Sequence, residues 1–165
     1  MTAKSLDRID LKILDVLQQD ARITNQALAD RVALSPSACL ARVRALEAKE
    51  LIRGYRAHVA VDRIRSATVV LAMVAFRRHA LEEFTAFDRR ILGMQEIVEA
   101  SRISGEYDYL LRVIVNDVHH WKDIARLLLG GDYGGEEIVS QFLMGEVKPF
   151  SGDPLGDGPT GKRSS

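Results

Sequence analysis

A connection of about three residues separates two helical patterns near the start of the chain. Thr24 is a good N-cap, and the apolar residues Leu28 and Val32 follow it on one face of the first helix. Residues 33–35 lead directly into Pro36, where proline opens the second helix without loss, because the first helical N–H has no partner within a helix. Two helices joined this closely must cross at a steep angle, so the sequence predicts a helix-turn-helix.

The segments on either side of this pair complete a predicted DNA-binding domain over residues 6–67, with the helix-turn-helix at about residues 25–44. Before the pair, apolar residues recur at helical spacing from Leu6 onward, and Asp7 is placed to cap that helix. After the pair, the stretch LIRGYRAHVAVD indicates two short strands broken at Gly54. These strands would form a small wing, which makes the domain a winged helix-turn-helix.

The helix predicted over residues 36–49 has two unlike faces. Its apolar side consists of Cys39, Leu40, Val43 and Leu46. Its opposite side consists of Ser37, Ala38, Ala41 and Ala45. Small residues let a helix lie close to base edges in a major groove about 12 Å wide, and the flanking Arg42 and Arg44 would reach the phosphates. The candidate DNA-binding residues are Ser35, Ser37, Ala38, Ala41, Arg42, Arg44, Lys49 and Arg53.

The distribution of charge supports this prediction. The formal net charge is zero, but residues 1–65 hold 12 Lys and Arg against 8 Asp and Glu, which leaves 11 against 15 for the rest of the chain. A positive first half favours a polyanion such as double-stranded DNA. Taken alone, the helix over residues 36–49 has a second interpretation, a solvated alanine-rich helix. The five Lys and Arg against two Glu in residues 35–56 favour DNA.

The second half of the chain alternates between strand and helix periods. Strands are predicted over residues 68–77, 95–104, 107–115 and 136–147, and helices over residues 81–91 and 118–128. The order is β-α-β-β-α-β, so residues 68–148 are expected to form a ferredoxin-like domain and the whole chain an α+β protein. Two helices cover one face of four strands, and the other apolar face needs a partner, most simply a second copy of itself. Residues 149–165 are rich in Gly, Pro and Ser and are expected to be a disordered tail.

Four motifs in this order resemble one known family. They are LDRID at residues 6–10, LSPSACLARVRALE at 34–47, LIRGY at 51–55 and SGEYDYLL at 104–111. Together they resemble the Lrp/AsnC, or feast/famine, transcriptional regulators over residues 6–148. The resemblance implies a recognition helix at residues 36–49. It also implies dimers that pair sheet to sheet and assemble further, often to octamers, with a small effector, commonly an amino acid, bound between dimers. No other cofactor is expected.

The resemblance places the effector beside one loop, which consists of Ser104, Gly105, Glu106, Tyr107 and Asp108. Gly105 permits a tight turn, and the Asp108 carboxylate could accept hydrogen bonds from an α-ammonium group. The alternative is a plain β-turn in which Asp108 makes a structural hydrogen bond. The chain departs from the family pattern at GGDYGGEEIV, residues 130–139, where members usually have a proline-glycine-valine turn.

Several other classes of function are disfavoured. The chain has no P-loop, GxSxG or HExxH pattern, and its single cysteine, Cys39, excludes an internal disulfide and a cysteine-rich zinc site. No apolar stretch reaches the roughly 18 residues of a membrane span, and the first residues hold no apolar signal core, so a cytoplasmic protein without membrane contact is expected.

Two alternatives to a DNA-binding regulator remain. His119 and His120 point about 100° apart on a helix, which disfavours a shared metal. Siroheme decarboxylases have the same fold, however, and use histidine and arginine, so an enzyme of that type is one alternative. The other is a ligand-binding module without DNA contact, which would leave the first 65 residues without a role. We expect no catalytic residues and no metal.

Overall fold

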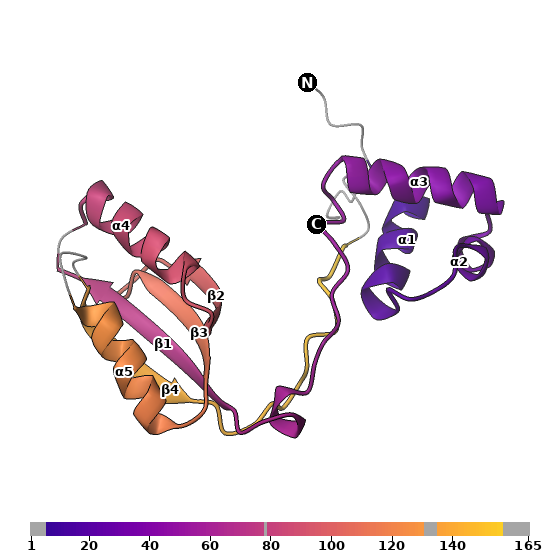
Figure 1. Ribbon diagram of the computed structural model, residues 1–165. Helices are drawn as coiled ribbons and strands as arrows, with labels where there is room; N and C mark the ends of the chain where they lie inside the picture. Colours follow the sequence, from indigo (N-terminus) through magenta and orange to yellow (C-terminus); the bar gives the residue numbers. More distant parts are fainter. Residues whose placement is uncertain (1–5, 78, 131–134, 157–165) are drawn as a thin grey trace, which may run out of the picture. The chain divides into compact units, whose positions relative to one another are not determined.

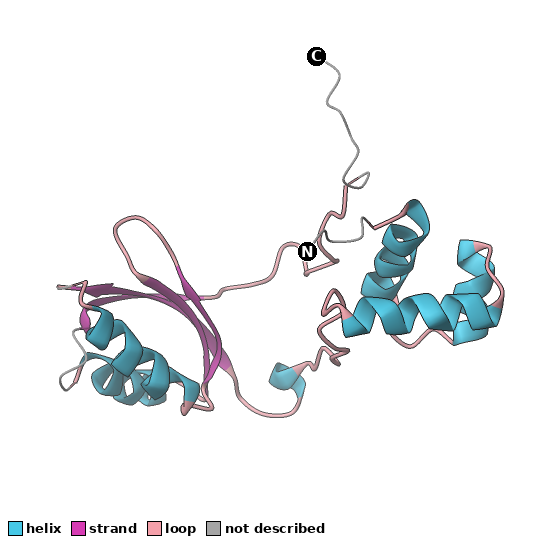
Figure 2. Cartoon of the chain, turned by 90° about the horizontal axis from the view of Figure 1, so that it is seen from above, coloured by secondary structure: helices cyan, strands magenta, loops and turns pink. Residues whose placement is uncertain are grey.

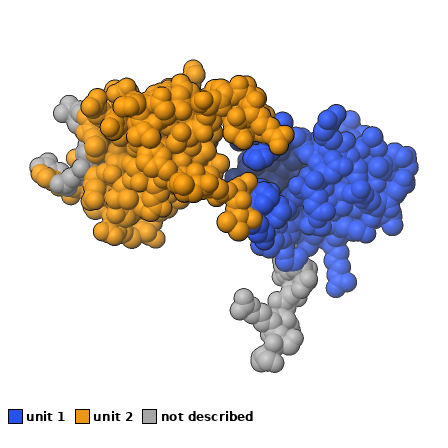
Figure 3. All heavy atoms as spheres, turned by 90° about the horizontal axis from the view of Figure 1, so that it is seen from below, with its two compact units in different colours: residues 1–58, 148–165 blue, residues 59–147 orange. Residues whose placement is uncertain are grey.

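The computed structural model describes residues 6–77, 79–130 and 135–156. These residues form two compact units, which Figure 3 shows in separate colours. The helical unit contains the described residues up to 58 together with residues 148–156, and the sheet unit contains residues 59–147. The chain therefore leaves the helical unit, builds the sheet unit and returns.

Three helices form the helical unit (Figure 1): α1 (Arg8–Gln19), α2 (Asn25–Val32) and α3 (Pro36–Ala48). Each helix begins after the predicted cap. Asp7 accepts from the Asp10 N–H, Thr24 from the Ala27 N–H and Ser35 from the Ala38 N–H, at 2.8, 3.2 and 3.3 Å. These caps satisfy backbone donors that the first turn of a helix leaves without partners.

The connection between α2 and α3 is as short as the sequence predicts. Ala33 ends α2 in the left-handed conformation, with φ 55° and ψ 48°, a region that costs a residue with a Cβ about 1–2 kcal/mol. The Leu34 N–H donates to the Ala29 carbonyl oxygen, which closes the turn. The helix-turn-helix is confirmed. Its core consists of Ile13, Val16, Leu28, Ala29, Val32, Cys39 and Leu46.

Two details of this unit differ from the prediction. Leu40, expected in the core, is 38% exposed, because the buried side of α3 is centred on Cys39 and Leu46. The predicted wing strands are absent, since residues 51–60 form no strand. The Tyr55 hydroxyl instead donates to Glu47 at 3.0 Å, which holds this segment to the end of α3. Among the described residues, the segment has no second strand to pair with.

The sheet unit has the predicted order of elements: β1 (Thr68–Phe76), α4 (Leu81–Leu92), β2 (Ile97–Arg102), β3 (Tyr109–Val115), α5 (Val118–Leu129) and β4 (Gly135–Phe142), preceded by a short 3-10 turn, η1 (Val61–Arg63). All strand pairs are antiparallel, and the order across the sheet is β2-β3-β1-β4. Figure 2 shows both helices of this unit on one face of the sheet. The ferredoxin-like βαββαβ arrangement is confirmed.

Side chains alternate between the two faces of the sheet. On β1, the side chains of Val70, Ala72 and Val74 are fully buried in the core beneath the helices, together with Phe87 and Tyr109. Val69, Leu71 and Met73 alternate with them and are half-buried. Leu110, opposite Met73 in the register, is 38% exposed. The face away from the helices therefore carries apolar side chains that are only partly covered, and Arg112 and Gln141 lie opposite Leu71 on the same face.

Part of the predicted disordered tail has defined contacts. Gln18 on α1 donates its amide N–H to the Asp153 carbonyl oxygen at 3.1 Å, and its amide oxygen accepts from the Asp153 N–H at 2.6 Å. Gly152, with φ 108°, packs so closely that an added Cβ would lie 3.0 Å from the Gln18 amide oxygen. Residues 148–156 therefore belong to the helical unit; the rest of the tail lies outside the described residues.

Candidate DNA-binding and effector sites

The open face of α3 consists of small or short side chains. Ser37, Ala38, Ala41 and Ala45 are all exposed. The start of α3 is held by α2, because Asn25 donates its side-chain amide to the Pro36 carbonyl oxygen at 2.8 Å. The start of α3 is therefore held by α2, and the exposed side of the helix carries only small side chains at these four positions.

Ser35 has two possible roles. Its hydroxyl caps α3 and lies 3.2 Å from the Ser37 hydroxyl, and both side chains are exposed. A serine hydroxyl can accept from a backbone N–H and still donate its own proton outward. The two hydroxyls and the first turn of α3 together provide donors of the kind that bind phosphate at a helix N-terminus.

Three of the predicted cations are exposed beside this face. Arg44 lies on α3, Lys49 follows its last residue and Arg53 lies in the segment after it. None has an ion-pair partner within 4 Å among the residues that the structure describes. Their side chains are therefore available to a polyanion.

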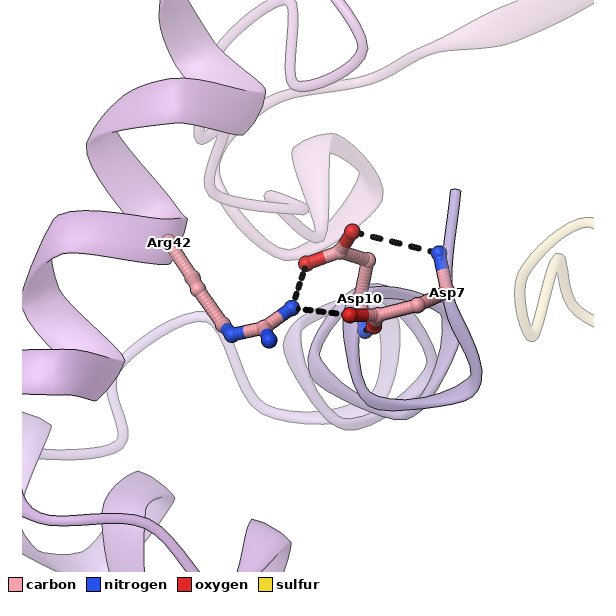
Figure 4. Close-up of polar contacts among 3 residues, drawn as sticks. All are labelled: Asp7, Asp10 and Arg42. Carbon is pink, nitrogen blue, oxygen red and sulfur yellow. Dashed lines mark hydrogen bonds and ion pairs between the residues drawn. The ribbon is translucent and has the colours of Figure 1, made fainter. Parts of the chain in front are cut away.

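Arg42 differs from these three cations. Its Nη1 atom lies 2.6 Å from Asp7 Oδ2 and 2.8 Å from Asp10 Oδ1, at the first turn of α1 (Figure 4). The backbone N–H of Asp10 and then the Arg42 guanidinium lower the pKa of Asp7, and the two carboxylates raise the pKa of Arg42. The structure thus places Arg42 in an ion pair within the helical unit, away from the open face.

Helical spacing contains a signal for this placement. Arg42 comes three residues after Cys39 and four before Leu46, both of which are buried. Positions three and four apart lie on one side of a helix, so Arg42 belongs beside the buried side and Arg44 on the open one. The sequence prediction gives both arginines the same role. The acidic partners of Arg42 are 35 and 32 residues away in the sequence, beyond the reach of a helical period.

The predicted effector loop joins β2 to β3. Ser104, Gly105 and Glu106 are exposed, and Gly105 has φ 120° with open space where a Cβ would be. This positive φ is a conformation that glycine adopts without strain. Tyr107 is half-buried, and burial followed by the Glu106 charge raises the pKa of its hydroxyl. The loop is a tight turn with its tip accessible.

Asp108 makes the structural hydrogen bond that was the alternative interpretation of this loop. Its Oδ2 accepts from the Phe76 N–H at 2.8 Å, across to the end of β1. Its Oδ1 lies 3.1 Å from His79 Nε2, and the side chain is 15% exposed. A carboxylate offers about four lone-pair sites, so these two contacts leave Oδ1 able to accept another donor. His79 was not singled out from the sequence, and no local motif marks it.

A second cluster lies at the same end of the sheet. Tyr109 donates its hydroxyl to Asp88 at 2.7 Å, and Asp88 also pairs with Arg102. The Arg102 guanidinium lies over the Phe84 ring, 5.2 Å from its centroid. Burial and then the Asp88 carboxylate raise the pKa of Tyr109 to about 12, so its hydroxyl stays protonated and donating. These contacts hold α4 against β2 and β3.

The histidine pair begins α5. The Asp117 carboxylate caps this helix by accepting from the His120 N–H at 2.9 Å, and His120 Nε2 lies 3.6 Å from Glu96. His119 is exposed. Within the described residues, no group of three His, Cys, Asp or Glu side chains could hold a metal ion. The same residues contain no helix that is long and apolar enough to span a membrane.

Two family models match the chain. Residues 6–53 match "Winged helix-turn-helix DNA-binding", and residues 69–152 match "Lrp/AsnC ligand binding domain". The leucine-responsive regulatory protein of Escherichia coli is 37% identical over 145 residues, which is 88% of each chain. The protein of that name from Serratia marcescens matches equally well.

Solved structures agree with these matches. A transcriptional regulator of Neisseria meningitidis, in complex with L-Met, has a TM-score of 0.84 and 32% identity, covering 92% of this chain and 98% of that one. An AsnC family transcriptional regulator of Agrobacterium tumefaciens has a TM-score of 0.82 and 29% identity, covering 91% and 97%. These relatives are named as regulators, so the siroheme decarboxylase alternative is not favoured.

Proposed function

The chain belongs to the Lrp/AsnC family of DNA-binding transcriptional regulators, and from that premise we propose that an α-amino acid or a related metabolite controls its binding to DNA. The observation that carries this proposal is the presence, in one chain, of an α3 with an open face of small residues and of a loop whose carboxylate, on Asp108, can accept a further hydrogen bond at Oδ1 beside His79. The protein is a regulator and not an enzyme.

We propose that the open face of α3 contacts base edges. Ser37, Ala38 and Ala41 are small and exposed, as close approach to a groove requires. Arg44, Lys49 and Arg53 would neutralise phosphates, and Ser35 would donate to one. In a dimer, two copies of α3 would read half-sites about 34 Å apart, or a multiple of that distance.

The effector would bind beside residues 104–108. Asp108 Oδ1 would accept from its ammonium group, and the backbone N–H groups of Ser104, Gly105 and Glu106 would meet its carboxylate. Two relatives support an amino acid: one is named leucine-responsive, and the other was solved with L-Met. The loop over residues 130–139, which is expected to influence effector preference, lies partly outside the described residues.

We also propose that the sheet unit assembles. The apolar side chains of Leu71, Met73 and Leu110 are only partly covered on the face away from the helices, and a second copy of the same face would bury them. Dimers of this kind would associate further, to an octamer, and the effector would act by favouring one assembly. It can change DNA affinity only through its differential affinity for the two states.

Thermal unfolding of the full chain against the twenty amino acids tests the effector proposal. A ligand at 100 times its dissociation constant adds about 2.7 kcal/mol of stability, which a melting curve resolves readily. We expect one amino acid, or a small group of similar ones, to raise the melting temperature. The same compound should change the apparent affinity for a duplex that the protein selects from a random-sequence pool.

Asp108→Asn is the matched variant. Asparagine keeps an oxygen to accept from the Phe76 N–H but lacks the charge that an ammonium group needs, so the fold should persist and the ligand shift should disappear. A ligand shift of unchanged size in this variant would contradict the assignment of Asp108. No shift with any of the twenty compounds would contradict an amino-acid effector.

A further inference from the structure

We infer that Arg42 is a positioning residue for DNA recognition: its guanidinium fixes the pose of α3 on α1 and does not neutralise a phosphate. This inference rests on α3 being the recognition helix, as proposed above. It differs from the sequence prediction, which placed Arg42 among the phosphate contacts.

The ion pair has a compact geometry. One nitrogen, Arg42 Nη1, contacts carboxylates of two residues, Asp7 at 2.6 Å and Asp10 at 2.8 Å. Figure 4 shows this nitrogen between the two acids, at the first turn of α1. The Arg42 side chain is 33% exposed and that of Asp10 only 17%. The Asp7 side chain is 49% exposed, so screening by solvent is weaker in the contact with Asp10 than in the contact with Asp7.

The two acids are held in place before Arg42 reaches them. Asp7 Oδ1 accepts from the Asp10 N–H at 2.8 Å, and Asp10 Oδ2 accepts from the Asp7 N–H at 3.3 Å, a reciprocal capping box. The positive end of the α1 dipole also favours negative charge at this turn. The receptor for Arg42 is thus a rigid part of α1.

Releasing Arg42 to a phosphate would be unfavourable. It would leave two carboxylates without their cation, and both would then lie in the field of the DNA backbone, which carries the same sign of charge. The pair therefore opposes transfer of Arg42 to DNA. Its position on α3, beside the buried side, points to the same conclusion.

The pair adds a second anchor to α3. Asn25 holds the first residue of the helix through the Pro36 carbonyl oxygen, and Arg42 holds a point six residues further on. Six residues span about 9 Å of helix. Two polar anchors at separate points limit both the tilt of α3 and its rotation about its own axis, on which contact with base edges depends.

Positioning predicts a particular pattern of binding. Phosphate contacts contribute to every sequence alike, whereas base contacts need a defined pose. Loss of Arg42 should therefore weaken binding to the preferred sequence more than binding to an unrelated one. The number of ions released on binding should not change, so the slope of log K against log salt should be preserved.

The experiment uses the full chain and two duplexes: one selected by the protein from a random pool, and a scrambled duplex of the same composition. Affinities are measured over a range of salt concentrations, below the melting temperature of every variant. For Arg42→Ala we expect about a tenfold loss on the selected duplex, equivalent to about 1.4 kcal/mol, little change on the scrambled one and an unchanged slope.

Asp7→Asn tests the ion pair through its acidic partner. It keeps the inference testable if Arg42→Ala unfolds. Asparagine caps a helix as well as aspartate does, so the variant keeps α1 and loses one of the two negative charges that face Arg42, while Asp10 remains. We expect the selected duplex to be bound several-fold more weakly. Asp15→Asn, on the same helix with Gln19 as its hydrogen-bonding partner, removes the same charge without touching Arg42 and should not lower affinity.

Three outcomes would overturn the inference. Equal losses on both duplexes with a flatter salt slope for Arg42→Ala would make Arg42 a phosphate contact. Tighter binding by Asp7→Asn than by Asp15→Asn would mean that the acid competes with DNA for Arg42. Unchanged affinities for Arg42→Ala, with only a lower melting temperature, would leave a purely stabilising role.

Arg44→Ala separates this inference from the function on which it rests. As a phosphate contact, Arg44 should weaken binding to both duplexes and flatten the slope by about 0.9. If that variant binds both duplexes normally, the proposed DNA face of α3 is wrong and the inference falls with it. If Arg44→Ala behaves as expected and Arg42→Ala behaves in the same way, only the inference fails.

Discussion

Arg42 in the helical unit and Asp108 in the sheet unit are both charged side chains whose polar atoms are engaged, yet they differ in what engages them. Arg42 is held by the side chains of two other residues, Asp7 and Asp10. Asp108 is held first by a backbone N–H, that of Phe76 at the end of β1. A side-chain partner can be substituted without altering the fold, whereas a backbone donor stays where the sheet puts it.

The two sites therefore affect different properties: the Arg42 pair affects the orientation of α3, and the Asp108 bond affects the stability of the sheet unit. The Arg42 pair sets how one helix lies on another, and its loss is expected to appear mainly in DNA specificity. The Asp108 bond closes the end of the sheet, because the Asp108 N–H also donates to the Val74 carbonyl oxygen at 2.8 Å. Its loss should appear first in stability, and the proposed effector would use the remaining capacity of Oδ1 to accept a hydrogen bond.

The largest expected effect is on the sheet unit. Asp108→Ala leaves the N–H of the buried residue Phe76 without its acceptor, which should cost about 2 kcal/mol of the free energy of unfolding. Asp108→Asn keeps an acceptor and should cost less than about 1 kcal/mol. Urea unfolding followed by fluorescence measures this directly, since the single tryptophan, Trp121, lies in the core of the sheet unit. Equal costs for the two variants would mean that charge, and not the backbone donor, makes Asp108 important.

A smaller effect is expected on the pH dependence of the helical unit. The folded pKa of Asp7 lies below its ordinary 3.8, so its ion pair and cap add stability at pH values above that value. This contribution is lost as the pH falls through the folded pKa. The stability difference between the native chain and Asp7→Asn, up to about 1 kcal/mol near neutral pH, should therefore shrink on acidification below about pH 4.

Urea unfolding followed by helical circular dichroism, repeated at several pH values, gives that difference. Asp15→Asn is again the control, and no such trend is expected for it. A difference that stays constant down to about pH 3 would show that the charge of Asp7 contributes nothing.

The smallest effect concerns a third kind of bond, from a neutral and exposed side chain to the backbone. Gln18→Ala removes both hydrogen bonds to Asp153 and should cost about 0.5 kcal/mol. Faster hydrogen exchange at the Asp153 amide is the sharper readout. Gln19→Ala is the matched control, because Gln19 donates to Asp15 on its own helix. Equal exchange rates in the two variants would contradict the contact.

The architecture was predictable because its signals are local. Ser35 and Pro36 mark the start of α3 from residues next to each other, and the alternation over residues 107–115 marks β3 as a strand. Arg42 was predicted to reach a phosphate, although its spacing from Cys39 and Leu46 already puts it beside the buried side of α3. Its partners could not be predicted, because nothing in a local period specifies which distant acid a cation will meet.

The predicted wing strands and the predicted disorder of residues 149–156 differ from the structure for related reasons. The stretch after Leu51 has the composition of a strand, but a strand needs a partner, and none is supplied by the described part of this chain. The tail has the composition of a disordered segment, but Gly152 and Asp153 fit against Gln18 because glycine allows close approach. In both segments a contact partner outside the segment decided the structure.

The hydrogen bond between Gln18 and Asp153 can form only late in the synthesis of the chain. The two residues are 135 positions apart, so at about 5–20 residues per second the ribosome makes the second roughly 7–27 s after the first. Helices form within about a microsecond, and the three-helix core therefore has time to assemble while synthesis continues. The contact between Gln18 and Asp153 forms only in molecules whose sheet unit has already been translated. A nascent chain whose translation stops within the sheet unit would have the helix-turn-helix without the contact between Gln18 and Asp153.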